Sequence, residues 1–286
     1  MPETKFKERT ARPSDIPDML VLFERAKTVM RASGNMQQWG DGYPNGEVLR
    51  NDMRRKASHI AQTEDGVMAG TFAFIPGIEP TYLTIKKGHW LDKYSLYGTI
   101  HRIAAEPGTG GFAKWAIDWC WEHMPNIRID THRDNSIMHH ILEREGFTRC
   151  GIIYLKDGSE RIAYQKICDI ERMVKDAHLV LPARLRSLSE EYGFSPKKVF
   201  LKRNRSNWGS CSSLGNVNLN VNLVRIPADL RDYVMLHELC HLRQLNHSKD
   251  FHDILEEICK AHFGPSPDGS PIYKAKEKAL KSYYPV

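Results

Sequence analysis

The sequence predicts two domains: an α/β domain built on a mixed sheet, followed by a small α+β domain. Its length of 286 residues suits two domains, at roughly 100–200 residues each. The first half alternates helical and strand-like segments, without the regular order of a fully parallel sheet. In the second half, one strand with strictly alternating polar and apolar residues precedes two helical segments.

The composition is that of a packed globular protein. Apolar residues make up 41% of the chain and charged residues 27%, which excludes a collagen, a disordered chain and a disulfide scaffold. There is no run of about 18 apolar residues that could span a membrane. Residues 1–9 lack the apolar core of a signal peptide, and the six cysteines form no Cys-x-x-Cys pair. We therefore expect a cytoplasmic protein with reduced thiols and no membrane partner.

The net charge of +6 is uneven, since residues 1–170 carry +1 and residues 171–286 carry +5. Such a basic excess can contact nucleic acid phosphates, but it is more often the solvated face of a strand. We therefore expect nucleic acid to be a weak, non-specific partner at most. The excess is concentrated in a run without acids, namely Lys197, Lys198, Lys202, Arg203 and Arg205.

In the first domain, a helix is expected over 14–31, with Ser14 as its N-cap. A loop rich in Gly, Asn and Pro follows over 33–47 and contains Trp39 and Tyr43. The later pattern predicts strands at 57–63, 67–75, 97–105, 127–131, 147–155 and 160–167, and helices at 110–124 and 135–145.

The second domain is expected to begin near 168–172, which gives domains 1–168 and 169–286. Its first segment, 168–196, is helical, with Pro182 as an interruption and Gly193 as the stop. Strand 216–223 alternates asparagine with valine and leucine, and 198–205 is its expected hairpin partner. Further helices are expected from about 228 and over 249–263, the latter capped by Ser248 and ended by Gly264.

A metal site is predicted by the segment His237-Glu-Leu-Cys-His241. On a helix, residues four apart share a face, so both imidazoles can reach one ion, while Glu238 can contact a metal-bound water without ligating the metal. His247 becomes a third ligand only if the chain turns back, and Asn246 tolerates the left-handed conformation expected for such a turn. Three nitrogen ligands with an open fourth position describe a catalytic zinc site.

Other readings of this helix are weaker. Two histidines four residues apart also occur by chance on an ordinary amphipathic helix. Cys240 lies between the two ligands in sequence, but its position on the helix favours packing in the core. Trp208, in the segment before the alternating strand, is either a lining residue of a substrate cleft or a packing residue.

The motifs Arg205-Ser-Asn-Trp-Gly-Ser-Cys, Gly215-Asn-Val-Asn-Leu-Asn, His237-Glu-Leu-Cys-His241 and Asn246-His-Ser-Lys-Asp-Phe251 occur in this order. Over residues 180–265 the chain resembles the YgjP-type zinc metallopeptidases, which are related to the SprT and WLM zincins. The resemblance implies a zincin-like domain that acts on a protein or peptide. It places Zn²⁺ on His237, His241 and His247, with Glu238 as the general base. His252 departs from the family, which has Trp there.

A glycine-rich turn between a strand and a helix, at 97–113, points backbone N–H groups at an anion and suits a pyrophosphate. Asn135, Met138, Leu142 and Gly146-Phe147 follow at the spacing of a known closing motif. Over about residues 8–167, the chain resembles the GNAT N-acetyltransferase superfamily. The resemblance implies a mixed sheet with helices on both faces, which binds acetyl-CoA and transfers the acetyl group to an amine.

The residues that the resemblance assigns to acetyl-CoA are Ile103, Ala105, Gly108, Gly110, Gly111, Ala113 and Asn135. Two of the family's functional positions are altered. Gly108 stands where the family has a basic residue or Gln, and the nearby Lys114 is a candidate to compensate. Leu142 replaces the tyrosine that acts as general acid, which leaves Tyr154 or solvent to protonate the thiolate.

The acceptor side has further candidates. His101 and Glu106 are possible bases for the acceptor amine, and either can equally be structural. Trp39 and Tyr43 are expected either to line the acceptor pocket or to cover the edge of the sheet.

The sequence thus predicts a zinc metallohydrolase fused to an acetyl-CoA-dependent N-acetyltransferase. In one alternative, acetyl transfer is the main activity and the zinc domain is regulatory. In others, the second half is a DNA-associated protease-like module, or the first half binds CoA without transferring an acetyl group.

Overall fold

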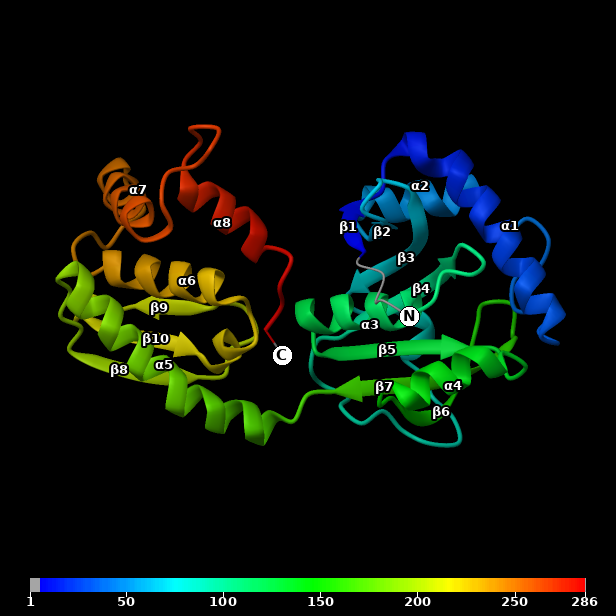
Figure 1. The fold of residues 1–286 in the computed structure, drawn as a ribbon. Helices are drawn as coiled ribbons and strands as arrows, with labels where there is room; N and C mark the ends of the chain where they lie inside the picture. Colours follow the sequence, from blue (N-terminus) through cyan, green and yellow to red (C-terminus); the bar gives the residue numbers. More distant parts are fainter. Residues whose placement is uncertain (1–5, 286) are drawn as a thin grey trace. The chain divides into compact units, whose positions relative to one another are not determined.

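The computed structural model describes residues 6–285. The first five residues of the segment examined for a signal peptide lie outside this range. The structure divides into two compact units, Met1–Ile167 and Cys168–Val286 (Figure 1). Within the described range, no helix is both long and apolar enough to cross a bilayer.

The N-terminal unit is built on a seven-stranded sheet with the order β1-β2-β3-β4-β5-β7-β6. β4 and β5 are parallel, and every other pair of neighbours is antiparallel. The predicted mixed sheet is therefore confirmed. The strands are β1 (Lys7–Thr10), β2 (Ser58–Gln62), β3 (Met68–Pro76), β4 (Gly98–Ala105), β5 (Asn126–Thr131), β6 (Thr148–Tyr154) and β7 (Glu160–Ile167).

Helices cover both faces of this sheet (Figure 1). Ile60 of β2 packs with Leu22 and Leu49, which belong to helices α1 and α2. The preceding residue, His59, contacts Trp119 of α3, with ring centroids 4.5 Å apart. Because successive residues of a strand point to opposite faces, α1 and α2 lie on one face and α3 on the other. The helices are α1 (Ile16–Ala32), α2 (Gly46–Arg54), α3 (Phe112–His123) and α4 (Ser136–Arg144).

Two local predictions in this unit were wrong. Ser14 lies in a 3-10 turn, η1 (Pro13–Asp15), so it is not the N-cap of α1. Helix α2 begins inside the segment expected to be a loop. Its signal in the sequence is Asn45, whose side chain accepts hydrogen bonds from the backbone N–H groups of Glu47 and Val48.

The C-terminal unit contains a three-stranded sheet with the order β8-β10-β9. Its strands are β8 (Lys198–Lys202), β9 (Gly209–Cys211) and β10 (Asn216–Asn220). The expected hairpin between 198–205 and 216–223 is wrong, because β8 runs parallel to β10. The antiparallel neighbour of β10 is β9, which forms within the segment expected to be the connection.

Four helices complete this unit: α5 (Ile170–Tyr192), α6 (Ala228–Cys240), α7 (Lys249–Phe263) and α8 (Ile272–Leu280). Pro182 does not interrupt α5, contrary to expectation. An internal proline costs about 3 kcal/mol, whereas each large apolar side chain of the helix contributes about 1.5–3 kcal/mol when it is buried. The buried stripe that continues across the proline consists of Met173, Ala177, Leu181, Leu185 and Leu188.

Both α5 and α6 share a hydrophobic core with Val217 and Leu219 of β10. Helices α7 and α8 pack against α6. The intervening residues of β10, Asn216 and Asn218, point to the opposite face of the sheet. This packing holds α6 against one face of the sheet, with β9 beside it.

Candidate functional sites

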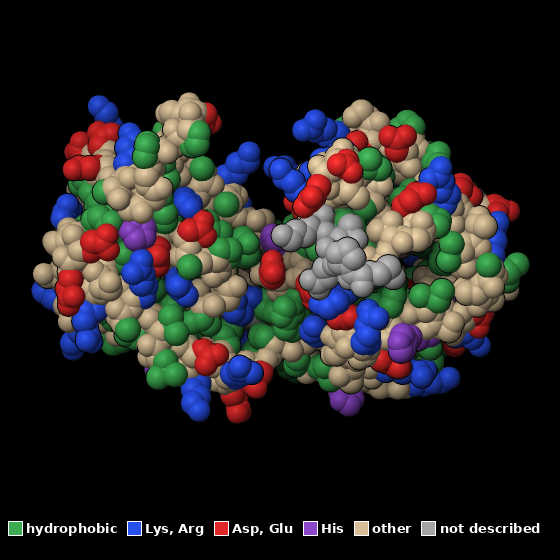
Figure 2. Space-filling model, viewed as in Figure 1, with side chains coloured by type: hydrophobic (Ala, Val, Ile, Leu, Met, Phe, Trp, Pro, Cys, Tyr) green, Lys and Arg blue, Asp and Glu red, His purple; other side chains and the backbone are tan. Residues whose placement is uncertain are grey.

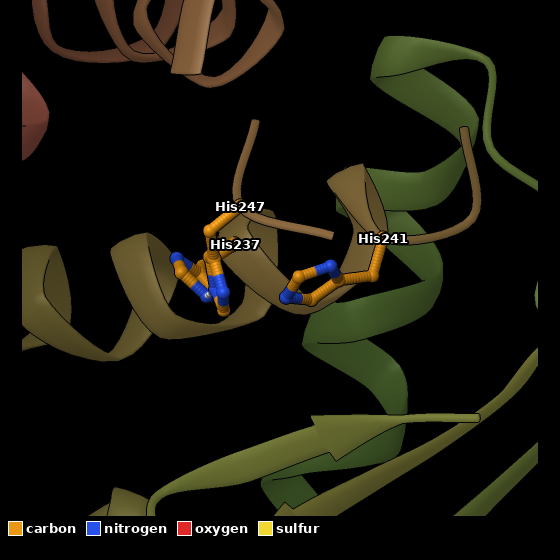
Figure 3. A group of neighbouring side chains, drawn as sticks. All are labelled: His237, His241 and His247. Atoms are coloured by element: carbon orange, nitrogen blue, oxygen red, sulfur yellow. Dashed lines mark hydrogen bonds between the residues drawn. The ribbon is translucent and has the colours of Figure 1, made fainter. Parts of the chain in front are cut away.

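The end of α6 and the turn after it bring three histidines together (Figure 3). His237 lies in the last turn of α6, and His241 is the residue at which the helix ends. The chain then turns back and places His247 beside them, so that one ligand nitrogen of each residue lies within 4.8 Å of the others. Asn246 does not have the expected left-handed conformation, because positive φ among described non-glycine residues is confined to Lys56, Lys87 and Arg102.

The orientation of the imidazoles suits a divalent metal. The Nε2 atoms of His237 and His247 face each other at 3.1 Å. The Nδ1–H of His241 donates to the backbone carbonyl of Gln244 at 3.1 Å, which leaves Nε2 of this ring available as a ligand. A cation between the rings would satisfy nitrogen lone pairs that otherwise face one another.

The protonation states also suit a metal. Burial, assisted by the neighbouring His241 and His247, lowers the pKa of His237 to about 3. Burial likewise lowers the pKa of His241 below its ordinary value. Because only a neutral imidazole ligates a metal, these two residues are ready to bind one at neutral pH.

The ring of Phe251 contacts the imidazole rings of all three histidines. It lies in the first turn of α7, which the Ser248 side chain caps as predicted by accepting from the Phe251 N–H. Its ring centroid is 5.0 Å from that of His237, 4.4 Å from that of His241 and 4.8 Å from that of His247. Phe251 is fully buried and lies in the core of the unit, so it couples the positions of the rings to the packing of α7.

Glu238 is buried beside β9. Burial raises the pKa of its carboxyl to about 8. A β-carbon on Gly209 would lie 2.7 Å from Cγ and 2.9 Å from Oε1 of Glu238, so the glycine provides the space that the carboxylate occupies. The roles of Phe251 and Gly209 were missed in the sequence, although both residues lie within the motifs that carry the resemblance.

The other residues of this unit singled out in the sequence, Cys240, Trp208 and His252, pack against neighbouring side chains. Cys240 is fully buried in the hydrophobic core of the unit, as expected. Trp208 is partly buried and packs against the same core. His252 stacks on Tyr273, with ring centroids 5.1 Å apart.

The N-terminal unit contains a cavity of about 930 Å³ between the loop after α1 and the middle of the sheet. It brings together several residues singled out in the sequence. Ile103 and His101 reach it from β4, Asn135 from the start of α4, and Trp39 and Tyr43 from the loop. Trp39 also packs edge-on against Phe23 of α1, at 5.5 Å between ring centroids.

The other residues predicted to bind acetyl-CoA lie between the end of β4 and the first turn of α3. Ala105 ends β4, and Ala113 lies in the first turn of α3. Gly108 has φ +86° and Gly111 has φ +79°, a region that favours glycine. At Gly108, Gly110 and Gly111, an added β-carbon would meet no atom within 4 Å, so the backbone of this loop is open to a ligand.

The proposed substitutes for the altered family positions have partners of their own. The Lys114 ammonium pairs with Asp118 and lies 4.0 Å from Glu145, which weakens the case that it compensates for Gly108. The Tyr154 hydroxyl donates to Glu160 at 3.1 Å, and this hydrogen bond raises its pKa.

The two candidate bases lie in different surroundings. Glu106 pairs with Arg25 at 2.5 Å on the surface. His101 lies in the cavity, with Nε2 at 3.7 Å from a carboxylate oxygen of Glu79. His101 also lowers the pKa of Glu79 to about 2. The geometry therefore favours His101 over Glu106 as a group that an acceptor can reach.

Gln38 connects the loop of Trp39 and Tyr43 to the rest of the cavity wall. Its Oε1 accepts hydrogen bonds from the side chains of Asn35 and Asn135, both at 2.7 Å. Asn135 also caps α4 by accepting from the Met138 N–H. Asn135 is thus placed to fix the shape of the cavity as well as to line it.

Comparison with known proteins gives a match for each part of the chain. A family model for the YgjP-like metallopeptidase domain matches residues 126–262, a range that begins at β5 and ends in α7. A GNAT-family acetyltransferase structure from Streptococcus agalactiae is 34% identical with a TM-score of 0.51, and the match covers 57% of this chain and 96% of that chain. A GNAT-family acetyltransferase structure from Listeria monocytogenes is 22% identical with a TM-score of 0.44, and the match covers 56% of this chain and 94% of that chain. No curated protein matches the chain.

Proposed function

Because this chain belongs to the GNAT acetyltransferase family and carries a YgjP-like metallopeptidase domain, we propose that it combines a zinc-dependent peptide hydrolase with an acetyl-CoA-dependent N-acetyltransferase. We assign the hydrolase to residues 169–286 and the transferase to residues 1–168. The observation that carries the hydrolase is the convergence of three imidazoles within 4.8 Å, on a helix whose Glu238, the residue after the first of them, is buried beside β9.

In the hydrolase, His237, His241 and His247 would hold Zn²⁺ through their ring nitrogens. When bound, zinc supplies a Lewis acid that polarises the substrate carbonyl and lowers the pKa of water. A bound Zn²⁺ would oppose the effect of burial and favour the ionised form of Glu238. The carboxylate would then take a proton from the attacking water and deliver it to the departing amine. Its buried position would limit access of bulk water to this transfer, and Gly209, which has no side chain, leaves the room that the carboxylate needs.

The test measures zinc content and peptide hydrolysis in two variants of the full chain. Glu238→Gln should keep about one equivalent of zinc while hydrolysis falls at least roughly 100-fold, as expected for loss of a general base. His241→Ala should lose zinc, because two protein ligands remain. His178→Ala, which removes an exposed histidine of α5, is the matched control and should change neither quantity. Loss of zinc from Glu238→Gln would make the glutamate a ligand and refute this role.

For the transferase, the carrying observation is the cavity that His101 and Glu79 share. His101 would take a proton from the acceptor amine, whose nitrogen attacks the thioester carbonyl carbon. The carbon–sulfur bond then breaks, and the CoA thiolate takes up a proton from solvent, since Leu142 offers none. Glu79 would stabilise the protonated imidazole, because its carboxylate lies beside the ring.

Calorimetry with acetyl-CoA tests this assignment. Gly111→Val should abolish binding, because a side chain would keep the backbone from the pyrophosphate. Gly66→Val is the matched control, since Gly66 has φ +80° and equally open surroundings but lies in the turn between β2 and β3. Binding should localise to residues 1–168 and survive removal of 171–286. Absence of acetyl-CoA binding by the intact chain would refute the transferase.

A further inference from the structure

The small sheet of the C-terminal unit has one apolar face and one polar face. Val217 and Leu219 of β10 point into the core. The alternate residues therefore share the other face, where Asn218 lies between Phe200 of β8 and Ser210 of β9. On either side of this row, the same register pairs Lys198 with Asn216 and Lys202 with Asn220, although the Asn220 side chain is buried and hydrogen-bonded to backbone carbonyls. We call this set the polar sheet face.

Phe200 is the unusual member of this face. Its side chain is 44% exposed, although it occupies the middle of a strand. Its cross-strand neighbour Asn218 is half-buried and donates to the Ser210 hydroxyl at 3.0 Å. An apolar ring is thus presented to solvent beside hydrogen-bonding side chains, an arrangement that can bind a flat ligand with polar edges.

The segment that forms this sheet carries charge of one sign. Between Glu191 and Asp229 the sequence contains no acidic residue and six basic ones, and all three strands lie within this interval. On the face of the molecule drawn in Figure 2, basic and acidic side chains are interspersed on both units. Lys198 and Lys202 are both exposed and lie four residues apart on β8, about 13 Å at ~3.3 Å per residue.

We propose that the polar sheet face binds single-stranded nucleic acid. A base would stack on Phe200, phosphates would contact Lys198 and Lys202, and the side chains of Asn216 and Asn218 would reach base edges. Stacking on an exposed aromatic within a basic surface is how proteins bind single strands with little sequence preference. A duplex keeps its bases stacked internally and cannot use the ring. An acidic peptide would use the lysines alone.

The proposal adds a binding activity to the two enzymatic ones and depends on neither. It also goes beyond phosphate attraction by a basic run, because it requires the exposed ring. Glu238→Gln, which is expected to lack hydrolysis, should bind nucleic acid as well as the unaltered chain. Failure of the proposed hydrolase and failure of this inference are therefore separable.

The experiment is fluorescence anisotropy of the full chain with a labelled oligothymidylate of about 12 nucleotides, within the range that single-strand binders cover. Phe200→Ala should weaken binding at least about fivefold, since stacking on one aromatic contributes at least ~1 kcal/mol, and Phe200→Tyr should retain binding. Lys198→Gln with Lys202→Gln should reduce the slope of log affinity against log salt by about 1.4, at ~0.7 for each phosphate contact to a single strand.

Lys278→Gln with Lys281→Gln is the matched charge control, because both lysines are exposed on or just after α8 of the same unit. This pair should leave the affinity and the salt slope unchanged. Equal binding by Phe200→Ala and the unaltered chain would overturn the proposal, as would tighter binding of a duplex of the same sequence. Competition by polyglutamate at an equal concentration of charges would instead identify an acidic protein surface as the partner.

Discussion

Phe251 offers the sharpest test of how the metal centre is built. Its ring is fully buried and lies 4.4–5.0 Å, between centroids, from the rings of His237, His241 and His247. Phe251→Ala would therefore remove a side chain from the core and also remove the ring that contacts the three histidines. The first loss affects the free energy of unfolding, and the second affects the affinity for zinc.

The two effects have different magnitudes. Truncating a buried phenylalanine to alanine costs about 3–5 kcal/mol of stability. Removing a residue that orients metal ligands costs about 10- to 100-fold in metal affinity. Leu255→Ala is the matched control, because Leu255 is fully buried one turn later on the same helix and contributes to the same core. It should cost about 2–5 kcal/mol and leave zinc affinity unchanged.

Urea unfolding in the presence of a chelator measures the stability of the metal-free chain, and titration against a chromophoric chelator measures the zinc affinity. Phe251→Leu keeps much of the buried surface, so it provides a folded variant if Phe251→Ala does not fold. The reasoning is refuted if Phe251→Leu and Phe251→Ala bind zinc as tightly as the unaltered chain, or if Leu255→Ala loses zinc to the same extent.

Three further predictions concern other residues. Gly209→Ala should lower the rate of peptide hydrolysis, because its β-carbon would lie 2.9 Å from Oε1 of Glu238. The adjacent substitution Ser210→Ala adds no such carbon and should leave the rate unchanged, which activity assays of both variants would measure. Burial lowers the pKa of His123, so the unfolded chain binds a proton that the folded chain excludes, and stability should fall as the pH drops below about 6.5. Urea titrations at several pH values should show this dependence reduced in His123→Gln. Gln38→Leu leaves two amide donors unpaired and should cost about 1–3 kcal/mol, measured by thermal unfolding, while raising the KM of the acceptor.

The three histidines could be grouped from the sequence because the relevant geometry is local. Residues four apart on a helix share a face whatever surrounds the helix, and the third ligand follows only six residues later. The contacts of Phe251 with the three histidines and the space around the Glu238 carboxylate could not be derived in this way. Phe251 and Gly209 reach the site from α7 and β9, and their contacts depend on how these elements pack against α6.

The errors in the fold have the same origin. Alternation correctly indicates one buried face over 216–219, but the strand ends at Asn220, residues 221–224 form a 3-10 helix, and the side chains of Asn220 and Asn222 are buried. The alternation also does not say which segment pairs with the strand or in which direction. The amide of Asn220 donates to the backbone carbonyls of Asn204 and Asn207, each at 2.7 Å, and so holds the segment that leads from β8 to β9. Pro182 was misjudged because local propensity was given more weight than the burial of a whole helix face.

The junction between the units is very short. Ile167 is the last residue of β7 and pairs with Asn126 of β5, in the interior of the seven-stranded sheet. Asp169 is the N-cap of α5 and accepts from the Arg172 N–H. A truncation a few residues before Cys168 would remove part of an inner strand, and one placed after Asp169 would leave α5 without its cap. Cys168 is therefore the place to cut the chain or to insert a flexible spacer when the two halves are expressed apart.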